Sequence, residues 1–166
     1  DGLLSRCLED NEEENKKMKQ IDLLISKKYN QVKVLNLIDS NQDIHIPKAF
    51  PDKVDVACRW CCHTFETHPW GIPMRYDAVN EIFYLSGYFC SPNCCLSYLI
   101  EKYKNNNNLW EYISLLNFMY YLVYKTDETI VPAPPQECLK LFGGPFHIQQ
   151  FRCLTLNNKN IYDVKF

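Results

Sequence analysis

The sequence lacks an excess of charge of either sign. Eighteen lysines and arginines are balanced by twenty aspartates and glutamates in 166 residues, and the formal net charge is −2. Residues 52–104 carry five basic side chains against six acidic ones, a net of −1. A protein that holds DNA by itself normally presents a basic face, because its affinity depends on counterion release. We therefore expect binding to nucleic acid that is weak at most and strongly salt-sensitive.

Long apolar runs are also missing. The most apolar stretch, residues 109–124, contains Glu111 and is followed by Lys125. It is short of the roughly 20 apolar residues that a membrane-spanning helix needs. This stretch predicts a buried core helix, and we expect no membrane association. No signal peptide is visible in the acidic opening of the chain, but the missing initiator methionine indicates a trimmed sequence, so this absence does not exclude a targeting segment.

Cysteine is abundant, but the number of cysteines is odd, so they cannot all pair as disulfides within one chain. Nine cysteines suit a reducing compartment better than a disulfide framework. Four of them form two pairs with metal-ligand spacing, Cys58 with Cys61 and Cys90 with Cys94. Zinc is bound at structural sites by four thiolate or imidazole ligands in a tetrahedron. We predict that these four cysteines bind one structural Zn²⁺ ion.

The second cysteine pair lies where a helix should begin. Ser91 can cap the helix, and Pro92 can occupy its first position, where the missing N–H has no consequence. Cys94 then falls in the first helical turn, where the helix dipole favours a thiolate. Cys90, just before the cap, can reach the same metal.

The segment between the pairs is too long for a compact finger and predicts a structured insertion. A knuckle at the first pair, a β-hairpin and a helix carrying the last ligand make a treble-clef-like arrangement. We therefore predict an α+β fold, a treble-clef-like zinc finger packed with additional α-helices. The expected segments are a turn at 69–73, strands at 74–76 and 82–85 separated by 77–81, and a strand end at 87–89.

Four further residues are alternative ligands. Cys62 and His63 directly follow the first pair, Cys95 follows Cys94, and His68 lies nearby. Adjacent residues on a tight turn or helix point in different directions, so one of each neighbouring pair should face away from the metal. We expect Cys62 and Cys95 to be buried as small apolar residues, while His63 and His68 remain alternatives to a thiol ligand.

The composition divides the chain into three parts. Residues 1–40 predict a helical N-terminal arm, with a helix over about 12–30 that is either solvated or partner-binding. Residues 41–104 contain the zinc-binding unit, and residues 105–166 a helical region packed on it in one core. The expected elements after the second pair are a helix to Tyr103, a loop at 105–108, a helix at 109–124 and a short helix at 136–142 ended by Gly143 and Gly144.

The sequence also resembles a known viral family. Residues 131–135 (VPAPP), 139–145 (LKLFGGP) and 151–152 (FR) follow residues 87–94 (GYFCSPNC) in an order that resembles the poxvirus late transcription factor three-like proteins of large nucleocytoplasmic DNA viruses. The Phe89-Cys90-Ser91 element is similar to FCS or MYM-type zinc fingers, which are treble-clef-like. The resemblance implies a zinc-binding factor of viral late transcription. At the level of single residues it implies only that the four paired cysteines are metal ligands.

This family implies production in the host cytoplasm, in the viral factory, with the virion as a second location. Because the charge balance is acidic, we expect the protein to act through protein contacts, with viral RNA polymerase or other viral transcription factors as partners. The alternative is a virus–host effector that suppresses innate immune signalling by binding a host signalling protein or a nucleotide. Trp60, Trp70 and Tyr76 could stack on bases or a nucleotide, or pack around the knuckle.

An enzyme is the third class, and the sequence argues against it. A zinc deaminase needs a His-x-Glu element and a Pro-Cys-x-x-Cys element, whereas Thr64 and Phe65 follow His63 and three residues separate Cys90 from Cys94. A cysteine hydrolase using Cys62 and His63 is the other form that an enzyme could take. A site closed by four cysteines has no open coordination position for water. We therefore expect no catalytic activity.

Overall fold

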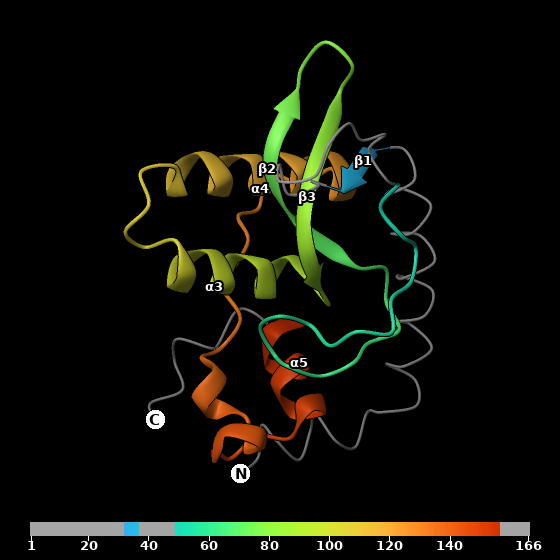
Figure 1. The fold of residues 1–166 in the computed structure, drawn as a ribbon. Coiled ribbons are helices and arrows are strands. Elements are labelled where there is room, and N and C mark those ends of the chain that lie inside the picture. Colours follow the sequence, from blue (N-terminus) through green and yellow to red (C-terminus); the bar gives the residue numbers. More distant parts are fainter. Residues whose placement is uncertain (1–31, 37–48, 157–166) are drawn as a thin grey trace, which may run out of the picture.

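The computed structural model of the chain describes residues 32–36 and 49–156. These residues form a three-stranded sheet, three α-helices and two short 3-10 helices (Figure 1). The α+β class predicted from the sequence is therefore confirmed. In chain order the elements are β1 (Lys33–Asn36), β2 (Trp70–Asp77), β3 (Ile82–Phe89), α3 (Pro92–Lys102), α4 (Leu109–Tyr124), η1 (Gln136–Cys138), η2 (Lys140–Phe142) and α5 (Ile148–Leu156).

The sheet is built on the hairpin of β2 and β3. These strands pair antiparallel, and β1 pairs with β3 in parallel, so the order is β1-β3-β2. At the hairpin turn the Asp77 carboxylate accepts hydrogen bonds from the backbone N–H of Val79 at 3.0 Å and of Asn80 at 3.2 Å. In Figure 1 this turn projects beyond the helices, while the other end of β3 leads towards α3.

Strand β2 begins earlier than predicted. The turn expected at residues 69–73 is wrong, because residues 70–73 already belong to the strand. Trp70 and Ile72 are each only 2% exposed, so burial outweighs the turn preference of Gly71 and Pro73. Pro73 cannot donate a ladder hydrogen bond, but β2 is an edge strand with a register shift between Pro73 and Arg75. The two strand segments expected at 82–85 and 87–89 form the single strand β3.

Helices α3 and α4 agree with the sequence prediction. Ser91 caps α3, its hydroxyl oxygen accepting from the backbone N–H of Cys94 at 3.2 Å, and Pro92 is the first helical residue. Helix α4 spans the predicted residues, and 105–108 belong to the connection before it. Within the described ranges, no helix combines the length and hydrophobicity needed to cross a membrane.

The core lies between the helices and the hairpin. Helix α4 packs against both β2 and α3, as Figure 1 shows. Leu99 of α3 and Leu116 of α4 are fully buried, and the ring of Trp70 stacks on that of Tyr124 with centroids 6.0 Å apart. One continuous cluster of buried side chains runs from Phe50 to Phe151. The cysteine-bearing segments and the C-terminal helices therefore share a core.

The region after α4 differs from its prediction. The single helix expected at 136–142 is wrong, because Leu139 is extended, with φ −78° and ψ 140°, and separates η1 from η2. Leu139 is fully buried, and core packing of this side chain favours the break. Gly143 ends η2 with φ 85°, the left-handed conformation that a glycine cap supplies. Helix α5 was not predicted.

The expected N-terminal helix over about 12–30 lies outside the described residues. Within the range 1–40 predicted as a helical arm, the structure describes 32–36, and Lys33–Asn36 is the strand β1. This strand follows the residues for which a helix was predicted. It pairs with β3, and the side chains of Val32 and Val34 pack against the core.

Candidate metal centre

The first cysteine pair lies on a tight knuckle, residues 58–61, closed by backbone hydrogen bonds. The N–H of Cys62 donates to the carbonyl oxygen of Cys58 at 2.9 Å. The N–H of Cys58 donates to the carbonyl oxygen of His63 at 3.0 Å. Cys62 adopts the left-handed conformation, with φ 58°, as the chain leaves the knuckle. The N–H of Arg59 donates to the carbonyl of Tyr88 at 3.1 Å and so ties the knuckle to β3.

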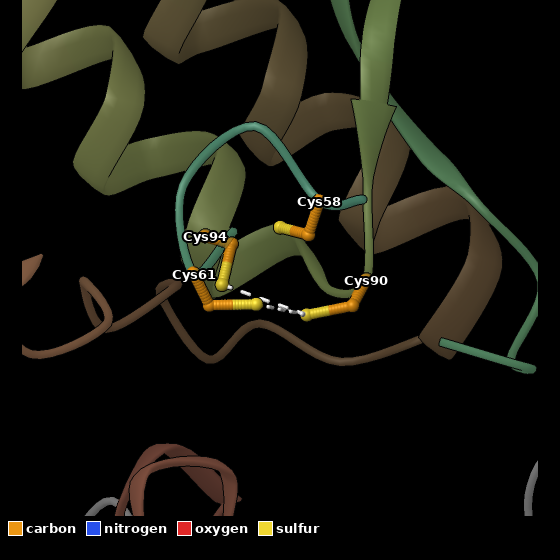
Figure 2. Close-up of side chains that lie close together, drawn as sticks. All are labelled: Cys58, Cys61, Cys90 and Cys94. Atoms are coloured by element: carbon orange, nitrogen blue, oxygen red, sulfur yellow. Dashed lines mark hydrogen bonds between the residues drawn. The ribbon is translucent and has the colours of Figure 1, made fainter. Parts of the chain in front are cut away.

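The second pair comes from the junction of β3 and α3. Cys90 directly follows the end of the strand, and Cys94 lies in the first turn of the helix. The Ser91 cap fixes this first turn, so the local sequence sets the direction in which Cys94 leaves the helix. The knuckle and this junction face each other, and Figure 2 shows the four cysteine side chains converging between them.

Cys58, Cys61, Cys90 and Cys94, hereafter the cysteine cluster, place their sulfur atoms within 4.8 Å of one another. The Sγ atoms of Cys61 and Cys90 are 3.8 Å apart, and those of Cys90 and Cys94 are 3.6 Å apart. Tetrahedral zinc with Zn–S bonds of about 2.3 Å has sulfur–sulfur edges of about 3.8 Å. The distances are far longer than the roughly 2.05 Å of a disulfide, and these cysteines are free thiols. The arrangement fits a metal ion at its centre.

The electrostatics of the cysteine cluster favour a cation. Two thiolates 3.8 Å apart repel by about 4 kcal/mol at an effective dielectric constant of about 20. The pKa of Cys61 is lowered because the neighbouring thiols of Cys58, Cys90 and Cys94 stabilise its thiolate. The pKa of Cys94 is raised well above that of an ordinary thiol because the neighbouring sulfurs of Cys58 and Cys61 favour its protonated form and because it is deeply buried. All four thiols can ionise together only when a cation lies among them, so metal binding releases protons.

Burial closes the site to solvent. Cys58, Cys61 and Cys94 are at most 1% exposed, and Cys90 is partly buried. A cation held by four such sulfurs has its tetrahedral shell filled by protein ligands, which is the pattern of a structural rather than a catalytic zinc site. The cysteine cluster can therefore hold a metal ion.

Cys62 and His63 lie beside the cysteine cluster but are not members of it. The Sγ atom of Cys62 lies 3.5 Å from the carbonyl oxygen of Trp60, and burial raises the pKa of the Cys62 thiol. The Nδ1 atom of His63 is 2.6 Å from the carbonyl oxygen of Cys61, so this ring nitrogen is engaged with the backbone of the knuckle. The structure does not bring either residue among the four sulfurs.

Cys95 and His68 are also placed away from the cysteine cluster. Cys95 is fully buried in α3, as the sequence predicted, and burial raises the pKa of its thiol well above the ordinary value. The His68 ring contacts the backbone oxygen of Pro69 at 3.0 Å and the carboxylate of Asp52 at 3.5 Å. The His68 side chain is 7% exposed, and this burial lowers its pKa.

Arg152 of α5 is a neighbour of the cysteine cluster that spacing did not reveal. Its Nη2 atom lies 3.7 Å from the Sγ atom of Cys61 and donates to the carbonyl oxygen of Thr64 at 2.9 Å. Burial alone would lower the pKa of this guanidinium, but the thiolates of Cys90 and Cys61 raise it. The sequence signal for this contact was the resemblance at residues 151–152, which assigned Arg152 no role.

A strap, residues 131–136, crosses the knuckle, and its last residue is the first residue of η1. The indole Nε1 of Trp60 donates to the carbonyl oxygen of Pro134 at 3.0 Å, and the amide Nε2 of Gln136 donates to the carbonyl oxygen of Trp60 at 2.6 Å. These bonds join residues more than seventy positions apart, because the sequence separations are 74 and 76. The strap therefore fixes the knuckle from the side of the C-terminal region.

The same strap is bound along α3. The N–H of Ala133 donates to the carbonyl oxygen of Asn93 at 3.1 Å, and the amide Nδ2 of Asn93 donates to that of Val131 at 2.8 Å. The hydroxyl of Ser97 donates to the carbonyl oxygen of Ala133 at 2.8 Å. The two cysteine-bearing elements, the knuckle and the start of α3, are thus held by one proline-rich segment.

Replacing Ser97 with alanine tests the contribution of the strap. Ser97 is 5% exposed, and its removal leaves the buried carbonyl oxygen of Ala133 without this donor. We expect a loss of about 1–3 kcal/mol in the free energy of unfolding, measured by chemical denaturation. The control is Ser114→Ala on the exposed side of α4, where the hydroxyl donates to the carbonyl oxygen of Trp110 and we expect a change within about 0.5 kcal/mol. Equal stability of the two variants would contradict the account.

Comparisons with known proteins point to a viral relative. The chain is similar to an uncharacterized protein of Acanthamoeba polyphaga mimivirus, with 30% identity over 108 residues. The match covers 60% of this chain but 29% of the mimivirus protein, so the chain spans less than a third of that relative. No protein-family model and no solved structure matches the chain. The comparisons thus agree with the sequence in pointing to large DNA viruses, and they name no specific family.

Proposed function

We propose that the cysteine cluster binds one structural zinc ion, and that the knuckle, the β2–β3 hairpin and α3 form a treble-clef-like finger around it. The observation that carries this proposal is the convergence of four buried or partly buried sulfurs within 4.8 Å. Thiolates in a tetrahedron are the usual donor set for zinc, whose filled d shell imposes no other geometry. Cys58 and Cys61 from the knuckle would hold the ion together with Cys90 and Cys94.

We infer further that the protein is not an enzyme. With four thiolates bound, the zinc ion has no position open to water or substrate. The alternative of a cysteine hydrolase is disfavoured because His63 directs Nδ1 to the carbonyl oxygen of Cys61. The raised pKa of Cys62 also keeps that thiol protonated, whereas a nucleophile needs the thiolate. The metal would supply folding energy rather than chemistry.

The proposed function is a viral zinc-binding factor of late gene transcription that acts mainly through protein contacts. The resemblance of residues 87–152 to the late transcription factor three-like proteins supports this role, and the mimivirus relative supports a viral origin. Exposed aromatic side chains on α4 offer surface of the kind that protein interfaces use. They are Trp110, Phe118 and Tyr121.

Independent binding to nucleic acid is expected to be weak. Four thiolates and one Zn²⁺ carry a net charge of −2, and two basic side chains are already engaged within the protein. The guanidinium of Arg75 lies 4.2 Å from the ring centre of Tyr84, and that of Arg152 contacts Cys61. Trp60 and Trp70 are buried, at 7% and 2% exposure, so neither offers a face for base stacking.

Affinity purification of the tagged protein from infected cells tests the function. We expect subunits of the viral RNA polymerase or other viral transcription factors to be recovered with the wild type. Recovery should fall at least about tenfold with Cys61→Ser, which removes one thiolate ligand, and stay unchanged with Cys138→Ser, whose half-buried thiol lies outside the cysteine cluster.

The alternative, a virus–host effector, makes a different prediction in the same experiment. Recovery of a host innate-immunity protein without any viral transcription protein would overturn the proposed role. The same host protein would then be recovered from uninfected cells expressing this chain alone.

A further inference from the structure

Arg152 connects the C-terminal helix to the cysteine cluster across a long sequence distance. Its guanidinium lies 3.7 Å from the Sγ atom of Cys61, from which it is separated by 91 residues in the chain. The same Nη2 atom donates to the carbonyl oxygen of Thr64, just after the knuckle, at 2.9 Å. A single side chain of α5 therefore contacts both a sulfur of the cluster and the backbone next to it.

The charge at this position is complementary. Four thiolates around one Zn²⁺ leave a net charge of −2 in a buried site, and a guanidinium beside them offsets part of it. An N–H donor directed at a thiolate also withdraws electron density from the sulfur, as outer-shell partners of metal ligands do. Arginine suits the position because its Nη2 atom carries two N–H donors, which can serve the sulfur and the carbonyl oxygen together on a group that stays charged.

The burial of Arg152 indicates that its polar contacts here are specific. Its Nε atom is buried and has no hydrogen-bond partner among the described residues. Burying an N–H group without a partner is unfavourable, so the remaining contacts of the guanidinium must offset that cost. Those contacts are the hydrogen bonds to Cys61 and Thr64 and the attraction to the Cys90 sulfur. The neighbouring residue Phe151 is fully buried, which fixes the backbone of α5 against the core.

We propose that Arg152 is a positioning residue of the metal centre, whose guanidinium donates to the Cys61 thiolate and makes metal retention and docking of α5 depend on each other. The inference rests on the proposed zinc site and goes beyond it. In this arrangement α5 supplies a side chain that contacts one of the metal ligands. Loss of zinc then loosens α5, and loss of the guanidinium weakens zinc.

The test compares the full chain with Arg152→Met and Arg152→Lys. Methionine keeps an unbranched apolar stem and removes the charge and the donors, whereas lysine keeps the charge but replaces the planar guanidinium with a compact ammonium group. Arg75→Met is the matched control, because Arg75 lies over the ring of Tyr84 rather than at the cluster. Zinc affinity is measured by chelator competition, and the sulfur-to-metal charge-transfer band is recorded with Co²⁺ in place of zinc.

We expect Arg152→Met to weaken zinc affinity by about 10–100-fold and to move the charge-transfer band to lower energy, because a thiolate without its donor gives up electrons more easily. Arg152→Lys should give smaller changes of the same sign, and Arg75→Met none. An unchanged band and unchanged affinity in Arg152→Met would overturn the inference and leave a purely structural role. If that variant does not fold, wild-type values for Arg152→Lys would overturn it. A wild-type chain that binds neither metal would overturn the zinc site itself, and this inference with it.

Discussion

Replacing Cys94 with serine is expected to abolish zinc binding and to lower the melting temperature by about 8–16 °C. Cys94 is buried in the first turn of α3, and a serine hydroxyl cannot replace its thiolate as a ligand. Zinc at about 1,000 times its dissociation constant stabilises the folded state by about 4 kcal/mol. In a protein of this size, about 1 kcal/mol corresponds to about 2–4 °C. Circular dichroism follows the melting, and elemental analysis gives the zinc content.

Two other cysteines provide controls for this result. Cys62→Ser changes a thiol next to the knuckle, and Cys138→Ser changes one in η1, and neither residue belongs to the cysteine cluster. Both variants should keep one zinc ion per chain and melt within about 2 °C of the wild type. Full zinc content in Cys94→Ser, or its loss in Cys62→Ser, would mean that the ligand set is wrong.

Replacing Phe151 with alanine is expected to lower the free energy of unfolding by about 3–5 kcal/mol. Phe151 is among the largest fully buried side chains of the described residues and anchors α5 in the core. Its truncation removes a phenyl ring and leaves a cavity that the surrounding side chains fill only in part. Chemical denaturation measures the change.

Leu141→Ala is the matched control for the core position. Leu141 is 59% exposed in η2, so its truncation should change the free energy of unfolding by about 0.5 kcal/mol or less. A loss below about 1 kcal/mol for Phe151→Ala would show that α5 contributes little to the core.

The gathering of the four cysteines was predictable because its determinants are local. The spacing within each pair is short, and Ser91 followed by Pro92 predicts the start of α3. The structure forms this cap as expected and brings the four sulfurs together. Helix geometry also distinguished the proposed ligand Cys94 from the buried Cys95, because successive residues on a helix point in different directions.

The surroundings of the cysteine cluster were not predictable, because they depend on long-range contacts. The bond from Trp60 to Pro134 and that from Arg152 to Cys61 join residues 74 and 91 positions apart. The local sequence of the strap and that of α5 do not indicate which distant residues they contact. The apolar residues of α5 do recur at helical spacing, at Ile148, Phe151 and Leu154, which was the available signal for this missed helix.

The boundaries that were wrong share one cause. At β2, glycine and proline favour a turn locally, but burial of Trp70 and Ile72 extends the strand. At Leu139, insertion of the side chain into the core interrupts what would otherwise be one helix. In both places tertiary packing overrides the local preference of the chain.

The coordination of zinc in the purified wild-type protein shows whether the four cysteines hold the metal. Zinc K-edge X-ray absorption of the full chain reports the number and type of ligand atoms around the metal. We expect four sulfur atoms at about 2.3 Å and no lighter ligand. A nitrogen or oxygen at about 2.0–2.1 Å would contradict the four-cysteine centre and return His63 as a candidate ligand. A folded protein that contains no zinc would contradict the claim altogether.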